Sequence, residues 1–241
     1  QELLDTRYNP FELTERLADY LIFGSYPEVV EATTPGDKIT TLSELVNSYI
    51  LKDILALENI KGSATLFAIL KLLAFQVGNL VSLNEIGNAV DIDVKTVRRY
   101  LDLLEKTFVL VRLGGYSRNL RSEITSKSKY YFLDNGIRNG IIQQYNALDL
   151  RMDTGQLWEN FVVMERLKHR AYSNIYANMY FWRTYSGREI DLVEEREGKV
   201  FAYECKWSDK RRIHAPKEWK ETYPNSQFTA VTPHNYLDII T

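Results

Sequence analysis

The C-terminal part of the chain alternates apolar and polar residues in the pattern of antiparallel β-strands. Three such runs follow one another with short turns between them, at 180–185, 188–194 and 199–207. A helical pattern over 156–170 precedes the runs, and a shorter helix and a last strand are predicted near 216–222 and 227–232. The pattern predicts an α+β domain over residues 136–241, with an antiparallel meander at its centre.

Helical spacing dominates the N-terminal part of the chain. Apolar residues recur at helical intervals in 11–32, 39–57 and 63–77. Two further helices are predicted on either side of a tight turn at Asp91-Ile92-Asp93, and the first of them has Ser82 and Glu85 at capping-box spacing. A strand over 108–113 and a returning strand over 129–133 follow. This is the order of a winged helix-turn-helix.

These patterns divide the chain into three parts. They are a helical segment over 1–60, a winged helix-turn-helix over 61–135 and the α+β domain over 136–241. A passage rich in loop-forming residues, from Asp134-Asn135-Gly136 to about Gly155, is the candidate boundary before the last part. At 241 residues the chain is long enough to bury the cores of two modest domains.

Composition places the chain among soluble globular proteins, because 45% of its residues are hydrophobic and 26% are charged. No apolar run approaches the roughly 18 residues that a membrane span requires. The single cysteine, Cys205, excludes an internal disulfide framework and a cysteine-rich zinc site, and it fits a reducing cytoplasm. The chain begins at Gln1, so we expect a piece of a longer cytoplasmic protein with no membrane partner.

The net charge of −2 is unevenly distributed along the chain. Residues 1–60 hold eleven acids and four bases, whereas residues 95–129 hold nine bases and three acids. The basic segment predicts contacts with the phosphates of duplex DNA. The expected contact residues are Lys95, Thr96, Arg98 and Arg99 on the second helix, and Arg118 and Arg121 on the wing. The alternative is a solvated helix face, with the two wing arginines paired to acids of the N-terminal helices.

The hairpin over 188–207 carries the candidate chemistry. With Glu197-Gly198 as a two-residue turn, Asp191 and Glu204 lie directly opposite each other, with Cβ atoms roughly 4.5–5.5 Å apart. Like charges repel in this position, and Mg²⁺, which takes carboxylate oxygens as ligands, would remove the penalty. Lys206 is predicted on the same face, where an ammonium can stabilise developing phosphate charge. The alternative is an ordinary hairpin whose charged residues are solvated or salt-bridged.

The spacing Asp191…Glu204-Cys205-Lys206 resembles the D…(D/E)xK motif of the PD-(D/E)xK nuclease superfamily, whose site lies on such a hairpin. That superfamily often adds an acid from a preceding helix, and Glu159 stands at that place. The resemblance implies a restriction-endonuclease-like α/β domain. It implies catalysis by Asp191, Glu204 and Lys206, with Mg²⁺ or Mn²⁺ held by Glu159, Asp191 and Glu204. Ile190 stands where the superfamily has proline.

A wider resemblance covers the chain from about residue 20 to 207. The order of DIDVKTVRRYLDLLEKTFVLVRL, KYYFLDNGIRN, GQLWENFVVMERL, YFWRTYSGREIDLV and YECKW is similar to the C-terminal region of a family of bacterial and archaeal AAA-type ATPases. That region is commonly labelled a domain of unknown function. In that family a P-loop ATPase core lies upstream. This chain has no GxxxxGK[ST] sequence, so the resemblance implies that ATP is bound by a domain outside it.

Two functions follow from these features. The first is a DNA-associated C-terminal module of an AAA-type ATPase, with a Mg²⁺-dependent phosphodiesterase (nuclease) site. The second is a non-catalytic regulatory or interaction module with a degenerate nuclease fold, which binds a protein partner or another copy of itself.

Overall fold

The computed structural model describes residues 10–48, 62–118, 127–208 and 213–241. The chain divides into two compact units that interleave along the sequence. Unit 1 comprises Gln1–Val77, Ser82–Val111 and Phe132–Asp153, and unit 2 comprises Gly78–Val81, Arg112–Tyr131 and Thr154–Thr241. The predicted domain boundaries near residues 60 and 135 stay predictions.

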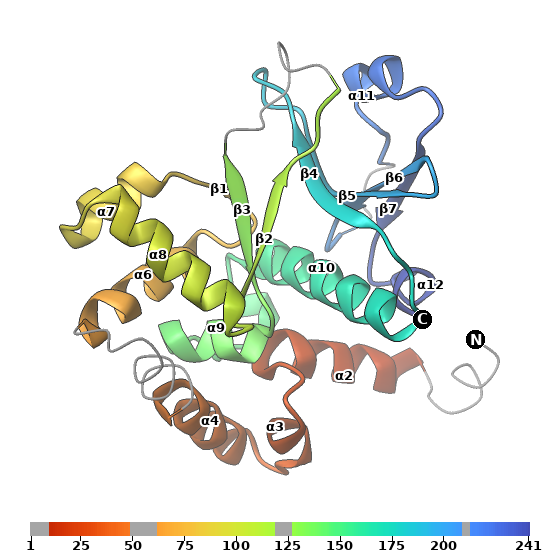
Figure 1. Ribbon diagram of the computed structural model, residues 1–241. Helices are drawn as coiled ribbons and strands as arrows, with labels where there is room; N and C mark the ends of the chain where they lie inside the picture. Colours follow the sequence, from red (N-terminus) through yellow and green to blue (C-terminus); the bar gives the residue numbers. More distant parts are fainter. Residues whose placement is uncertain (1–9, 49–61, 119–126, 209–212) are drawn as a thin grey trace. The chain divides into compact units, whose positions relative to one another are not determined.

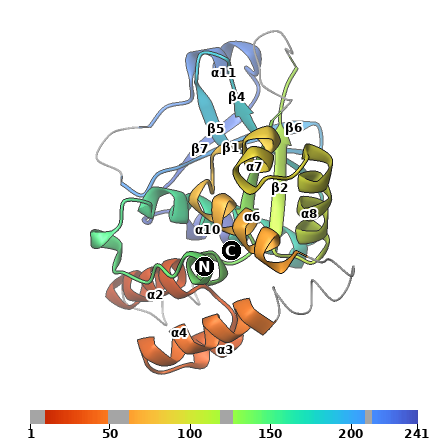
Figure 2. The same cartoon turned by 90° about the vertical axis from the view of Figure 1, so that its left-hand side faces the viewer.

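Unit 1 is helical. Its α-helices are α2 (Pro10–Phe23), α3 (Pro27–Glu31), α4 (Pro35–Glu44), α6 (Ser63–Phe75), α7 (Leu83–Val90), α8 (Val94–Lys106) and α9 (Asn135–Ile142). Figure 2 shows α6, α7 and α8 grouped together, and both α6 and α8 contact α7. The helix predicted over 39–57 begins within α4, and its residues from 49 onward lie outside the described residues.

The two helices predicted around Asp91-Ile92-Asp93 are confirmed as α7 and α8. The Ser82 hydroxyl accepts a hydrogen bond from the Glu85 backbone N–H at 3.4 Å, and the Asp93 carboxylate accepts one from the Thr96 N–H at 2.9 Å. Asp91 ends α7 in the left-handed conformation, with φ of 54°. Side-chain capping of the free N–H groups explains why both helices begin where the sequence indicates.

The passage predicted as a loop begins instead with helix α9. The Asp134 carboxylate accepts hydrogen bonds from the Ile137 N–H at 3.0 Å and the Ser25 N–H at 2.6 Å, so it caps α9 and fastens the turn after α2. Gly136 lies against the same turn, because a Cβ atom there would be 1.9 Å from the Phe23 carbonyl oxygen. Asp134-Asn135-Gly136 is therefore a helix cap in close contact with another segment, which local turn propensity does not reveal.

Unit 2 is built on a seven-stranded mixed sheet in the order β1-β3-β2-β4-β5-β6-β7 (Figure 1). The strands are β1 (Leu80–Val81), β2 (Leu110–Gly115), β3 (Ser128–Phe132), β4 (Asn178–Arg183), β5 (Glu189–Arg196), β6 (Lys199–Cys205) and β7 (Gln227–Val231). Strand β2 pairs with β4, and β6 with β7, in parallel. The pairs β1–β3, β4–β5 and β5–β6 are antiparallel.

The elements of the C-terminal part follow the predicted order. Helix α10 (Thr154–Tyr172) precedes the antiparallel meander β4–β5–β6, and α11 (Lys217–Thr222), β7 and the short α12 (Leu237–Ile240) follow it. Figure 1 shows α10 running beside the sheet, and the Trp158 indole N–H donates to the Val231 carbonyl at 3.1 Å. The chain is thus a mixed α/β protein. Among its described helices, none combines the length and the apolar character needed to cross a membrane.

Both faces of the β5–β6 hairpin are buried, which the alternating sequence did not indicate. Val193 and Ala202 pack in an apolar cluster with Trp219, while Leu192 and Tyr203 are buried as well. Asp191 is only 6% exposed. Of the alternative in which the charged residues of the hairpin are solvated or salt-bridged, solvation therefore does not hold at Asp191, which lies 3.7 Å from the buried Lys129 ammonium.

Candidate functional site

Four acidic side chains and two lysines of unit 2 gather where β5, β6, β3 and α10 meet. We refer to them as the acid–lysine cluster: Glu159 on α10, Glu189 and Asp191 on β5, Glu204 on β6, Lys129 on β3, and Lys206 directly after β6. The predicted site residues Glu159, Asp191, Glu204 and Lys206 all belong to it.

The register of the hairpin is the predicted one. The turn at Glu197-Gly198 pairs Arg196 with Lys199, and the pairing continues to Leu192 with Tyr203. The same register carried one step further sets Asp191 opposite Glu204. Asp191 turns one oxygen, Oδ2, to the backbone of the facing strand, where it accepts the Cys205 N–H at 2.8 Å.

Lys129 lies at the centre of the cluster, although the sequence suggested a basic residue of an exposed wing. Its side chain is fully buried. The ammonium contacts Glu159 Oε1 at 3.1 Å, contacts the Glu189 carboxylate, and lies 3.7 Å from Asp191 Oδ1. Three carboxylates converge on one ammonium, which is within hydrogen-bond distance of Glu159 and Glu189 and attracts Asp191 through charge alone.

Glu159 is held from several sides. Tyr131 follows Lys129 by two residues on β3, and its hydroxyl donates to Glu159 Oε1 at 2.7 Å. Gly78 lies against the same carboxylate, because a Cβ atom there would be 3.0 Å from both Glu159 oxygens, and its φ is +77°. The position of this acid is therefore fixed by β3 and by the backbone before β1.

Glu204 and Lys206 form a more accessible pair. The Lys206 ammonium lies 2.6 Å from Glu204 Oε1, and the side chains are 46% and 15% exposed. The other oxygen of Glu204, Oε2, is buried and has no hydrogen-bond partner among the residues that the structure describes. A buried carboxylate oxygen without a donor is costly, and it indicates a place where a ligand or ion can bind.

Two acids of the cluster have strongly raised pKa values. Burial and the negative charge of Asp191 raise the pKa of Glu159 to about 7, although Lys129 and Tyr131 oppose the change. Burial and the charge of Asp191 also raise the pKa of Glu204 to about 7, against the opposing effect of Lys206. Burial alone would lower the pKa of Lys129, but the charges of Glu159, Asp191 and Glu189 raise it well above its ordinary value. Acid pKa values near neutrality are typical of functional sites.

The fit of the cluster to a divalent cation is partial. The unpartnered Glu204 oxygen and the adjacent Asp191 are hard oxygen donors of the kind that Mg²⁺ and Mn²⁺ prefer. Glu159, the third predicted ligand, is instead bound to Lys129 and Tyr131. Within the described ranges, no group of three or more His, Cys, Asp or Glu side chains is arranged to hold a metal ion.

The predicted DNA-binding residues of α8 share one side of that helix. Lys95, Arg98 and Arg99 are exposed, and Lys95 and Arg98 form no ion pair with any described residue. Thr96 is different, because its hydroxyl donates to the Asp93 carboxylate at 2.7 Å as part of the helix cap. Three cations remain available on this helix.

Of the two arginines predicted on the wing, the structure describes Arg118. The Arg118 guanidinium is exposed and lies 3.7 Å from the Glu195 carboxylate on β5, so its acid partner is on the hairpin. Its backbone N–H donates to the Tyr223 hydroxyl at 2.9 Å. Arg121 lies outside the described residues.

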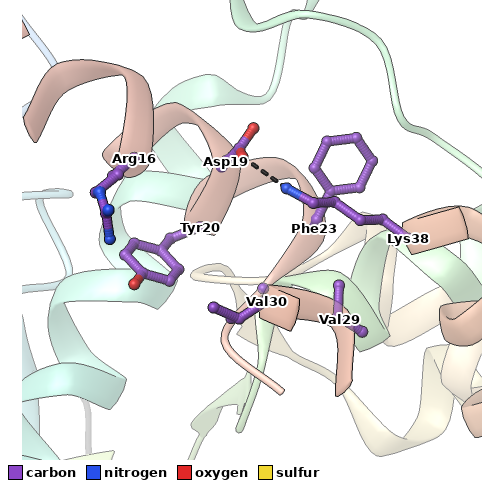
Figure 3. A pocket seen from close by; sticks show the side chains of 8 residues that line it. Arg16, Asp19, Tyr20, Phe23, Val29, Val30 and Lys38 are labelled. Carbon is purple, nitrogen blue, oxygen red and sulfur yellow. Dashed lines mark hydrogen bonds and ion pairs between the residues drawn. The ribbon is translucent and has the colours of Figure 1, made fainter. Parts of the chain in front are cut away.

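A separate pocket of about 280 Å³ lies in unit 1, between α2, α3 and α4 (Figure 3). Lys38 spans it, because its ammonium lies 2.7 Å from the Asp19 carboxylate and 5.2 Å from the centre of the Phe23 ring. The rest of its wall is formed by Arg16, Tyr20, Gly24, Val29 and Val30. None of the predicted site residues lines this pocket.

The sequence did not identify Lys129, Tyr131 and Glu189 as parts of the site. The charge pattern of the sequence assigns Lys129 only to the basic segment over residues 95–129. A lysine at the start of the otherwise apolar and aromatic stretch Tyr130-Tyr131-Phe132 was the available signal, since a buried strand rarely includes an unpaired charge. Glu189 stands two residues before Asp191 and shares its face by period-two alternation.

Comparisons with known proteins give family matches over most of the chain. A family model described as Domain of unknown function (DUF8612) matches residues 14–148, and one described as Domain of unknown function (DUF4143) matches residues 154–236. An uncharacterized protein of Haemophilus influenzae is 29% identical over 188 residues, which are 76% of this chain and 44% of that protein. No solved structure matches the chain.

Two further relatives match over similar lengths. An uncharacterized protein of Mycobacterium tuberculosis is 28% identical over 185 residues, 76% of this chain and 41% of its own length. One of Methanocaldococcus jannaschii is 22% identical over 209 residues, 83% of this chain and 45% of its own length. The chain thus spans less than half the length of these curated relatives.

Proposed function

We propose a function for this chain, which belongs to the family described as Domain of unknown function (DUF8612). The chain is proposed to be a DNA-associated module of a larger protein, and the module itself is proposed to contain a site for phosphodiester hydrolysis. The larger protein is proposed to be an AAA-type ATPase, of which this chain is the C-terminal region. The share of the relatives that the chain covers, 41–45%, leaves room for an ATP-binding domain elsewhere in such proteins.

A restriction-endonuclease-like fold is proposed for the C-terminal part. Its support is the order of elements: a helix, three antiparallel strands, a helix, and a strand parallel to the third. The acids stand at the corresponding places, since Glu159 is on the first helix and Asp191 and Glu204 are on the second and third strands. For α7, α8, β2 and β3, a winged helix-turn-helix is proposed from the order of the elements and the caps of the two helices.

The observation that carries the hydrolytic site is the unpartnered Oε2 of Glu204 beside Asp191. These two residues would hold Mg²⁺ or Mn²⁺, which commonly binds through one or two carboxylates plus water and phosphate oxygens. Such an ion would polarise the phosphate and lower the pKa of water.

The residues of the chain would then act on the substrate as follows. The Lys206 ammonium, nearly half exposed, would pair with the negative charge that develops on the phosphate oxygens. Hydrolysis adds water across one P–O bond and leaves an alcohol and a phosphate monoester. Glu204 would give up its contact with Lys206 when the phosphate arrives, because the ammonium can pair with either anion.

Calorimetric titration with Mn²⁺ tests this site. We expect the parent protein to bind Mn²⁺. Mutation of a residue that supports a metal ligand typically weakens metal binding about tenfold to a hundredfold, and Glu204→Gln removes a ligand itself, so we expect its affinity for Mn²⁺ to fall by at least that factor. Cleavage of a DNA probe should be lost in the same variant. Glu218→Gln, which removes an exposed carboxylate of unit 2, is the matched control and should behave as the parent. A parent protein that binds no Mn²⁺ would contradict the proposal.

DNA contact is proposed for the exposed side of α8. Lys95, Arg98 and Arg99 offer three cations that can pair with backbone phosphates. In unit 2, Arg118 is a separate candidate for a phosphate contact, since its pairing with Glu195 is exposed and long, and a pair of that kind is weak.

The salt dependence of DNA affinity tests this contact. We expect the affinity for duplex DNA to fall steeply with salt, and the slope of log affinity against log salt to shrink by about one for each of Lys95→Ala and Arg98→Ala. Lys71→Ala, an exposed lysine on α6, is the control and should leave the slope unchanged. Equal slopes in all variants would place the DNA contact elsewhere or exclude it.

A second function is favoured by Lys129. Because its ammonium already offsets part of the negative charge of three carboxylates, the cluster can persist without a metal ion. The corresponding proposal is a non-catalytic regulatory module that binds a protein partner or another copy of the chain. The absence of Mn²⁺ binding, together with DNA affinity too weak to detect at low salt, would support this function over the first.

A further inference from the structure

The inner part of the acid–lysine cluster has the composition of a cation site whose cation is a side chain. Carboxylates of Glu159, Glu189 and Asp191, from one helix and one strand, surround the Lys129 ammonium. Hard oxygens from several carboxylates are also what a divalent cation binds. The ammonium is fully buried and therefore fills this position rather than lying at its edge.

Lys129 is fixed in this position by the sheet. Strand β3 pairs Lys129 with Leu80 of β1, and the ammonium lies 5.9 Å from the centre of the buried Phe181 ring on β4. Tyr131, two residues along β3, donates to the same Glu159 oxygen as Lys129. Displacing Lys129 would therefore disturb the strand and uncover three like charges, so an incoming cation cannot easily replace it.

The outer part of the cluster is not filled in this way. Within the described part of the chain, Glu204 Oε2 has no donor, and Asp191 Oδ1 is 3.7 Å from Lys129, beyond hydrogen-bond distance. The outer position therefore has oxygens to offer, whereas those of the inner position are already engaged.

We propose that Lys129 takes the place of a second metal ion, so that the cluster binds one divalent cation, at Asp191 and Glu204, and not two. The inference rests on the proposed hydrolytic site and specifies its charge arrangement. In two-metal phosphodiesterases the ions lie roughly 3.5–4 Å apart and share the charge of the transition state. Here one ion would carry that charge, and Lys129 is a positioning residue that holds Glu159 beside Asp191.

The stoichiometry of Mn²⁺ binding tests this inference apart from catalysis. We expect one Mn²⁺ per parent chain by calorimetry, and two in Lys129→Met, because the inner carboxylates are then free. Lys129→Arg keeps the charge and should still bind one. Lys206→Met removes the same charge from the outer edge of the cluster and should also still bind one, so it controls for a general effect of lost positive charge.

The outcomes separate this inference from the proposed function. Two Mn²⁺ in the parent, or one in Lys129→Met, would overturn the inference and leave the hydrolytic site standing. No Mn²⁺ in the parent but one in Lys129→Met would overturn the hydrolytic site and, with it, the single ion that this inference places at Asp191 and Glu204. No Mn²⁺ in either protein would overturn both. Should Lys129→Met fold only with Mn²⁺ present, the rise of its melting temperature with added Mn²⁺ supports the inference, and the stoichiometry of the parent decides independently.

Discussion

Each unit of the protein contains a buried ionic network, and the two networks have opposite balances of charge. In unit 1, the single carboxylate of Asp153 lies between the guanidinium groups of Arg138 and Arg151. In unit 2, the acid–lysine cluster contains four carboxylates and two ammonium groups. The partly exposed guanidinium of Arg183 adds a third cation, which pairs with Glu189. The first network has cations in excess of acids, and the second has acids in excess.

The unit 1 network has the features of a structural element. Arg151 donates to both Asp153 oxygens, at 2.8 and 2.9 Å, and Arg138 donates to Asp153 and to the Ala74 carbonyl. Burial by itself would raise the pKa of Asp153, but the hydrogen bonds and charges of the two arginines lower it to about 2. The carboxylate is therefore stabilised as an anion, and the network needs no further ion.

The unit 2 cluster has the opposite features. Glu159 and Glu204 have pKa values raised to about 7, and one Glu204 oxygen has no donor in the described ranges of the chain. The carboxylates are destabilised as anions, so an added cation would improve their energy. Burial of charge is common to both networks, and the sign of the pKa shift distinguishes the structural network from the candidate site.

The largest expected effect is the loss of the single acid in the unit 1 network. Asp153→Asn leaves two buried guanidinium groups without a carboxylate, and we expect it to destabilise unit 1 by about 3–5 kcal/mol. Chemical denaturation followed by far-ultraviolet circular dichroism measures the change, because unit 1 is helical. Asp149→Asn removes an exposed acid from the same segment and should change stability by less than about 0.5 kcal/mol.

The comparison would break if the two networks responded alike. Glu204→Gln removes an acid from the cluster with excess acid, so it should not destabilise unit 2 as Asp153→Asn destabilises unit 1. Comparable losses in the two variants would mean that Glu204 is a structural residue, and its unpartnered oxygen would then carry no functional meaning.

The hairpin half of the site was predictable from the sequence, and the rest was not. A two-residue turn at Glu197-Gly198 determines the register, and register with period-two alternation sets Asp191 opposite Glu204. These are local rules. Lys129 meets Glu159 across 30 residues and meets Asp191 across a longer separation, so its role depends on how β3 joins the sheet. Charge counting along the chain assigned it to a surface for the same reason.

The helical half shows the same limit. Capping residues located the starts of α7 and α8 because a cap acts within three residues. Asp134-Asn135-Gly136 has the composition of a turn, yet it caps α9. Asp134 also accepts a hydrogen bond from the turn after α2, more than 100 residues earlier in the chain. The sequence separation of 109 residues makes this contact invisible to local patterns.

The pH dependence of stability gives a smaller effect of opposite sign in the two units. Glu159 and Glu204 bind protons more tightly in the folded protein than in the unfolded chain, because their pKa values rise from 4.5 to about 7. Their protonated forms favour folding, so the unfolding free energy of unit 2 should fall by roughly 1–3 kcal/mol as pH rises from about 4.5 to 7. For Asp153, whose pKa is lowered from 3.8 to about 2, stability is instead present above pH 3.8 and lost as pH falls toward 2.

Tryptophan fluorescence isolates the effect in unit 2, because all four tryptophans, Trp158, Trp182, Trp207 and Trp219, lie there. Glu204→Gln cannot ionise at this position, so roughly half of the fall between pH 4.5 and 7 should disappear in that variant, while Glu218→Gln should keep all of it. Saturating Mn²⁺ should reduce the fall in the parent, because an ion bound at Asp191 and Glu204 favours the ionised carboxylates. A stability of unit 2 that rises over this range would show that the carboxylates of the cluster are stabilised as anions, as Asp153 is, and the contrast between the two units would be lost.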